Sequence, residues 1–101
     1  MKKITCYKAR GKYKEICNIF RDLLNIENVE FQEIEDKDKK RIVVYVYDHA
    51  LMVIPITVLS IIVAIMRYLE YYFNGIATLE YLNAEACKLK IIVTKKKRVK
   101  K

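Results

Sequence analysis

The sequence predicts a small α+β domain, a two-layer sandwich with two amphipathic helices on one face of a mainly antiparallel sheet. Two stretches repeat apolar residues with the period of a helix, and the remaining apolar stretches are short and alternate as strands do. Only two glycines and one proline occur among 101 residues, which argues against disorder. The predicted order is β-α-β-β-α-β-β, and two helices bury their apolar faces most simply against one side of the sheet.

The N-terminal part is predicted to form a strand followed by a helix. Residues 2–9 alternate apolar and polar side chains, and Arg10-Gly11 ends that pattern. From Lys12 to about Asn25 the apolar residues fall on one side of a helical wheel, opposite a polar side. The apolar side consists of Tyr13, Ile16, Cys17, Ile19, Phe20, Leu23 and Leu24.

Two β-rich runs, residues 29–36 and 41–48, are joined by a short charged turn and predict a hairpin. The second run is apolar on both faces, which favours a central strand. Its odd-numbered residues include Tyr45 and Tyr47, which we expect on the face away from the helices. A second hairpin is predicted from residues 76–82 and 88–94, on either side of a polar turn.

The long apolar stretch at residues 57–73 is predicted to be the main core helix, ended by Asn74-Gly75. An alternative is a small single-span membrane protein with residues 50–72 in the bilayer, because Ala50 to Met66 carry no charge. Pro55 interrupts that run, and lysines lie on both sides of it. These two features favour a soluble helix.

The layout looks like the ferredoxin-like arrangement with an added strand. It is also similar in outline to Alba-type chromatin proteins, whose last strand likewise ends in a basic tail. If the first and last strands are neighbours, as in ferredoxin-like folds, the two ends of the chain join into one basic surface. We predict a single domain over residues 1–95 and a basic tail over residues 96–101.

Basic residues gather at the two ends of the chain. Residues 2–14 hold six basic and no acidic residues, and residues 88–101 hold eight basic and no acidic ones, within a net charge of +8. Such ends can neutralise phosphates and release counterions. They can equally attract anionic lipid.

Residues suited to catalysis are scarce. His49 is the only histidine and follows a predicted strand, where a structural role is expected. No phosphate-binding glycine loop or metal-ligand motif occurs in the sequence. Cys6, Cys17 and Cys87 are odd in number and widely spaced, which predicts reduced, buried thiols in a cytoplasmic protein. We therefore predict a protein that is not an enzyme and uses no cofactor or metal.

The predicted function is that of a basic accessory or regulatory protein that binds DNA or RNA, mainly through non-specific phosphate contacts. Tyr45 and Tyr47 are candidate base-stacking residues. The predicted phosphate contacts are Lys8, Arg10, Lys12, Lys14, Lys95, Lys96, Lys97, Arg98, Lys100 and Lys101. The alternative is a protein-interaction module that dimerises through the sheet face away from the helices, and we expect a homodimer for the first function as well. The composition, rich in Lys, Ile, Glu and Tyr, is common in proteins from hot environments or from AT-rich genomes, which favours an archaeal, viral or plasmid origin.

Overall fold

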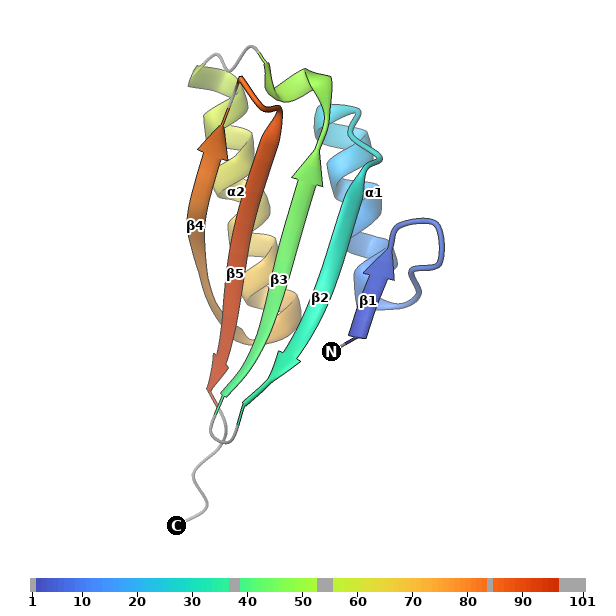
Figure 1. Ribbon diagram of the computed structural model, residues 1–101, viewed down its shortest axis with the longest axis vertical. Helices are drawn as coiled ribbons and strands as arrows, with labels where there is room; N and C mark the ends of the chain where they lie inside the picture. The colour runs from blue at the N-terminus through green and yellow to red at the C-terminus, as the bar shows by residue number, and fades with distance from the viewer. Residues whose placement is uncertain (1, 37–38, 53–55, 84, 97–101) are drawn as a thin grey trace.

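The computed structural model describes residues 2–36, 39–52, 56–83 and 85–96 and confirms the predicted α+β two-layer sandwich (Figure 1). Two helices lie behind a five-stranded sheet in that view. The elements are β1 (Lys2–Thr5), α1 (Lys12–Leu24), β2 (Val29–Glu35), β3 (Lys39–Tyr47), the short 3-10 helix η1 (His49–Leu51), α2 (Ile56–Phe73), β4 (Gly75–Asn83) and β5 (Lys88–Lys96).

The sheet is antiparallel throughout, with the strand order β1-β2-β3-β5-β4. Both predicted hairpins are present, β2 with β3 and β4 with β5. The apolar strand β3 is central, as its sequence predicts, and Val44 pairs with Phe31 on one side and Ile91 on the other. Strands that are apolar on both faces therefore occupy the middle of this sheet.

The first and last strands are not neighbours, so the condition for a joined basic surface is not met. β1 lies at one edge, and β2 and β3 separate it from β5. The first strand is also shorter than the predicted 2–9, because the chain turns after Thr5, with the Lys8 amide donating to the Thr5 carbonyl at 3.0 Å. Side-chain alternation determines the face of a strand but not its neighbour, so the ferredoxin-like detail did not follow from the pattern.

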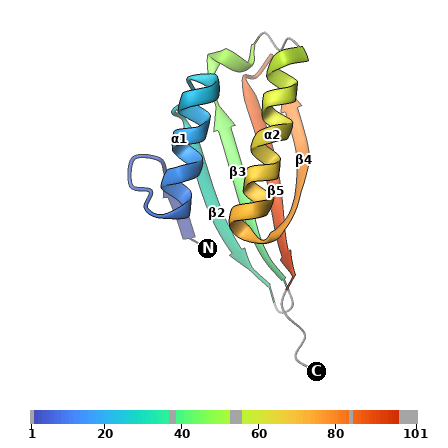
Figure 2. The same ribbon diagram turned by 180° about the vertical axis from the view of Figure 1, so that it is seen from behind.

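Both helices cover the same face of the sheet, and the core lies between the two layers (Figure 2). Phe20 of α1 and Leu69 of α2 are fully buried there. They pack into one cluster with the inward-facing strand residues Phe31, Val44 and Ile91. The opposite face of the sheet carries no helix and is turned toward the viewer in Figure 1.

The helices end at asparagines in the left-handed conformation. Asn25 follows α1 with φ +55° and donates its amide to the Arg21 carbonyl at 2.9 Å, and Asn74 follows α2 with φ +52°. Gly75 comes next and lies so close to β5 that a Cβ atom there would collide with the Thr94 carbonyl. The Asn74-Gly75 signal therefore ends the helix as predicted, while Pro55 lies outside the described residues.

The cysteine prediction is wrong for two of the three residues. Cys6, in the turn after β1, forms a disulfide with Cys17 on α1, across a Cα–Cα distance of 5.7 Å. Cys87 is a buried free thiol, as predicted. A spacing of eleven residues without a recognised motif gave no signal for the bond, which depends on the chain folding back after β1. Because disulfides are rare in the cytosol, the bond weighs against the cytoplasmic location, which stays a prediction.

Candidate nucleic-acid interface

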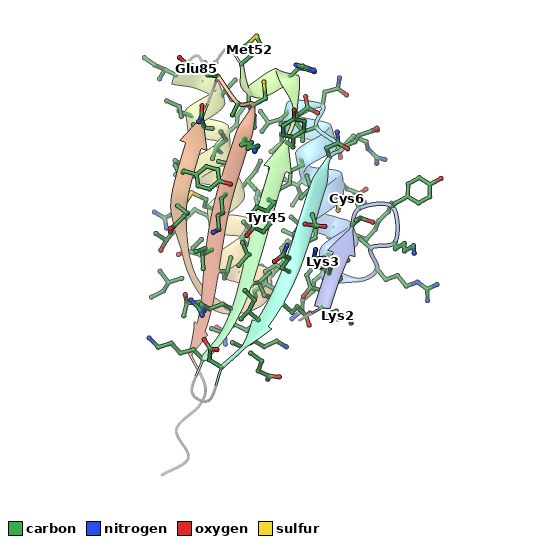
Figure 3. The ribbon with its side chains drawn as sticks, viewed as in Figure 1. Lys2, Lys3, Cys6, Tyr45, Met52 and Glu85 are labelled. Carbon is green, nitrogen blue, oxygen red and sulfur yellow. A yellow bond between two sulfur atoms is a disulfide. The ribbon has the colours of Figure 1, made fainter. Side chains whose placement is uncertain are left out.

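The uncovered face of the sheet displays tyrosines at one end of its central strands. Ile42, Val44 and Val46 of β3 point into the core, so the alternating residues Tyr45 and Tyr47 point to the uncovered face. Figure 3 shows Tyr45 on this face, over the middle of the sheet. The expected orientation of both tyrosines is therefore confirmed.

Lysines lie directly beside these tyrosines on the neighbouring strand. Tyr45 pairs across the sheet with Lys90, and Tyr47 pairs with Lys88. The Lys90 ammonium nitrogen lies 5.4 Å from the centre of the Tyr45 ring, within the range of a cation–π contact. On the other side of β5, Tyr81 of β4 is the partner of Lys90. We call Tyr45, Tyr47, Tyr81, Lys88 and Lys90 the tyrosine–lysine face.

A β-bulge brings Tyr81 to this face. Ala77 of β4 is buried against the helices, and strict alternation would send Tyr81 to the same side. The register shifts between Leu79 and Tyr81, so Glu80 is an extra residue and Tyr81 pairs with outward-facing Lys90. Sequence reasoning missed Tyr81 because no glycine or other bulge signal marks this position.

Two shallow hollows border the tyrosines, and their charges differ. One, of about 540 Å³, lies between Tyr7 and the pair Tyr45 and Tyr47, and Glu27 and Glu30 line it. The other, of about 240 Å³, is lined by Tyr45, Val46, Tyr47, Tyr81, Lys88 and Leu89. A polyanion is repelled from the first hollow and attracted to the second, so the tyrosine–lysine face has one electrostatically favoured side.

A second group of lysines lies at the other end of the sheet, on the helix side. Lys40 and Lys95 are cross-strand partners there, and the Lys95 ammonium lies 5.7 Å from the centre of the Phe73 ring. Burial lowers the pKa of Lys95, and the positive charges of Lys40 and Lys12 lower it further. Lys12 and Lys95 are thus brought together, but they do not share a face with the tyrosines.

The remaining predicted contacts are dispersed. Lys8 and Arg10 are exposed in the turn between β1 and α1, and Lys14 is exposed on α1. Lys96 is the last residue of β5. Lys97, Arg98, Lys100 and Lys101 lie outside the described residues. Within the described residues, the basic ends therefore do not join into one continuous surface. Lys88 and Lys90, which belong to the basic C-terminal stretch, lie beside Tyr47 and Tyr45 on the uncovered face.

A catalytic or metal-binding arrangement finds little support in the geometry. The His49 Nδ1 atom lies 4.0 Å from the sulfur of buried Cys87, beyond the direct proton-transfer distance of about 3 Å. Among the described residues, no group of three His, Cys, Asp or Glu side chains could hold a metal ion. The absence of enzymatic activity and of a cofactor stays a prediction.

The apolar helix α2 bears on the membrane alternative. Of the described residues, only this helix is long and apolar enough to cross a membrane by length and composition, with a mean hydropathy of 1.5 over 18 residues. Its inner side, with Ile62, Ile65, Leu69 and Phe73, is part of the core between the two layers. Crossing a bilayer would require α2 to leave that core.

No family model, curated protein or solved structure matches this chain. A functional proposal therefore rests on the geometry of the uncovered sheet face.

Proposed function

We propose that the protein binds single-stranded nucleic acid on the tyrosine–lysine face. The observation that carries the proposal is the row Tyr45, Lys90 and Tyr81 across three adjacent strands, with Tyr47 and Lys88 in the next row. Aromatic rings on an open sheet face stack on unpaired bases of any sequence, and neighbouring cations contact the phosphates.

Exposure and charge both suit this ligand. Tyr47 and Tyr81 are exposed, whereas a structural tyrosine would normally bury its ring. Glu30 borders the tyrosines on the β2 side, so the phosphate backbone is expected to follow β5 and β4 instead. The loop cations Lys8 and Arg10 and the basic C-terminal residues would add diffuse attraction without base recognition.

This proposal narrows the sequence-based prediction from DNA or RNA in general to unpaired strands. Duplexes hide their bases, so they would engage only the dispersed lysines, whereas a single strand engages rings and lysines together. A role as an accessory or regulatory factor is part of the same proposal.

Fluorescence anisotropy with labelled single-stranded and duplex oligonucleotides, titrated with salt, tests it. We expect tighter binding of the single strand. Replacing Tyr47 and Tyr81 together by leucine should cost about 1–3 kcal/mol for each base that no longer stacks. Phenylalanine at the same positions should preserve binding, because stacking needs the ring and not the hydroxyl.

A charge variant distinguishes phosphate contacts beside the tyrosines from attraction by basic residues elsewhere on the surface. Lys88→Gln with Lys90→Gln should lower the slope of log affinity against log salt by about 1.4, since each single-strand phosphate contact contributes about 0.7. Lys2→Gln with Lys39→Gln removes the same charge at exposed positions at the other end of the sheet and is the matched control. Equal losses in both variants, or no preference for single strands, would contradict the proposed site.

A further inference from the structure

The helix α2 has a second apolar side that the rest of the protein leaves uncovered. Only 22% of the residues of this helix are buried, although its composition is apolar on nearly every side. Ile56, Val63 and Tyr71 are 82%, 50% and 81% exposed. A helix at the surface of a soluble monomer normally shows polar residues to water, and contiguous exposed apolar residues mark an interaction site.

The uncovered residues form one stripe along the whole helix. They recur at intervals of three and four, so they share one side of α2, and all of them are exposed. We call them the outer stripe: Ile56, Leu59, Ser60, Val63, Ala64, Arg67, Tyr68 and Tyr71. The last part of the stripe borders an apolar hollow of about 500 Å³ lined by Ala64, Arg67, Tyr68 and Tyr71.

The outer stripe is complementary to itself. A twofold axis through the midpoint between Val63 and Ala64 places two copies of α2 antiparallel and pairs each member with another member. The pairs are Ile56 with Tyr71, Leu59 with Tyr68, Ser60 with Arg67, and Val63 with Ala64. Small residues therefore lie near the axis, where helices approach most closely, and large apolar residues meet toward both ends.

The charges on this side also favour a second copy over other occupants. Arg67 is the only charged member of the stripe, and its guanidinium contacts the Glu70 carboxylate of the same helix at 2.7 Å. In the antiparallel arrangement Arg67 meets Ser60, so like charges do not oppose each other. With its one cation already paired, the stripe offers little attraction to an anionic lipid surface or a nucleic acid.

We propose that the protein is a homodimer in which the outer stripes of two copies pack antiparallel across a twofold axis. The two sheets then lie on the outside of the dimer, and both tyrosine–lysine faces stay free. This interface lies on the helix side, whereas the sequence-based alternative placed dimerisation on the uncovered sheet face. The proposal does not depend on nucleic-acid binding.

Sedimentation equilibrium across a wide concentration range tests the interface. We expect the wild-type protein to have the mass of two chains. Ala64→Glu and Ala64→Lys should each reduce it to one chain, because like charges then meet near the axis. An equimolar mixture of the two variants should restore the dimer, which neither misfolded protein nor a changed membrane affinity would produce.

Two controls complete the experiment. Leu23→Glu places the same charge at an exposed apolar position of α1 and should leave the dimer mass unchanged. Far-ultraviolet circular dichroism during thermal unfolding should show that all variants fold. A concentration-independent monomer mass for the wild type, or a dimer that persists in both Ala64 variants, would overturn the proposal. So would a wild-type monomer that sediments with phosphatidylserine vesicles and loses that binding in Ala64→Glu, because the stripe would then contact lipid.

Discussion

The two helices cover the same sheet, but they differ in what they show to water. Along α1, which the structure describes in full, Leu23 is the one large apolar side chain that is exposed, and the other exposed residues include Lys14, Arg21 and Asp22. Along α2 large apolar side chains are exposed from Ile56 to Tyr71, with Ser60 and Arg67 between them. Burial against the sheet accounts for the sequence of α1, whereas α2 carries more apolar surface than the sheet can cover.

The helices are also attached to the sheet in different ways. The Cys6–Cys17 disulfide ties α1 to the end of β1, and the Tyr13 hydroxyl of α1 donates a hydrogen bond to the Glu33 carboxylate of β2. Burial and this contact raise the pKa of Tyr13. On α2, the Glu70 carboxylate accepts a hydrogen bond from the Ala77 amide of β4 at 2.9 Å. We therefore expect α1 to depend on specific bonds and α2 mainly on apolar packing.

The largest expected effect is on the buried side of α1. Phe20→Ala removes a fully buried ring between the layers and should lower the free energy of unfolding by about 3–5 kcal/mol. Leu23→Ala, on the exposed side of the same helix, should change it by no more than about 0.5 kcal/mol. Urea unfolding followed by circular dichroism measures both. Similar losses of stability in the two variants would mean that Phe20 is not buried, or Leu23 not exposed, as the structure describes.

A smaller effect on stability is expected from the disulfide that joins α1 to the turn after β1. Reduction of the Cys6–Cys17 disulfide should lower the free energy of unfolding by about 2–3 kcal/mol, because the open loop gives the unfolded chain more freedom. Urea unfolding with and without dithiothreitol measures the difference. A variant with serine at both positions should unfold alike in both conditions. If the free energy of unfolding of the wild type is also the same with and without dithiothreitol, the two sulfurs are not bonded in solution.

The sequence predicted the elements well, because each depends on local periodicity. The helix residues Phe20 and Leu69 and the strand residue Val44 all lie in the core, as their spacing requires. The neighbours of each strand were harder to predict, and β1 lies at an edge instead of beside β5. Strand order depends on contacts between distant segments, which alternation within one strand does not encode.

The candidate site was predicted only in part for the same reason. The orientation of Tyr45 and Tyr47 follows from alternation in β3 and is confirmed. Tyr81 joins them through a bulge, and Lys88 and Lys90 through the register of β3 with β5. The Cys6–Cys17 bond likewise depends on a turn after β1 that the sequence predicted to be strand. Local pattern thus identified the rings but not the cations that lie beside them.

The smallest expected effect concerns the polar contact of α2. The Ala77 amide, and next the Arg67 side chain, lower the pKa of Glu70 by favouring its ionised form. Its contribution to stability is therefore present above the ordinary carboxyl pKa of 4.5 and is lost as the pH falls through the lower value of the folded state. Glu70→Gln should be less stable than the wild type at neutral pH, and the gap should close in acid.

Urea unfolding of both proteins across the acid range measures that gap. Glu80→Gln, at the bulge of β4, removes an equal charge without affecting the hydrogen bond of the Ala77 amide. It should change the free energy of unfolding little at any pH. The amide lies on β4, an edge strand, so the Glu70 carboxylate also covers a donor that could otherwise pair with another chain. A gap that persists in acid would mean that Glu70 holds α2 to β4 through packing. In that case α2 would be held to the sheet by packing alone, whereas α1 is held by a disulfide and a hydrogen bond.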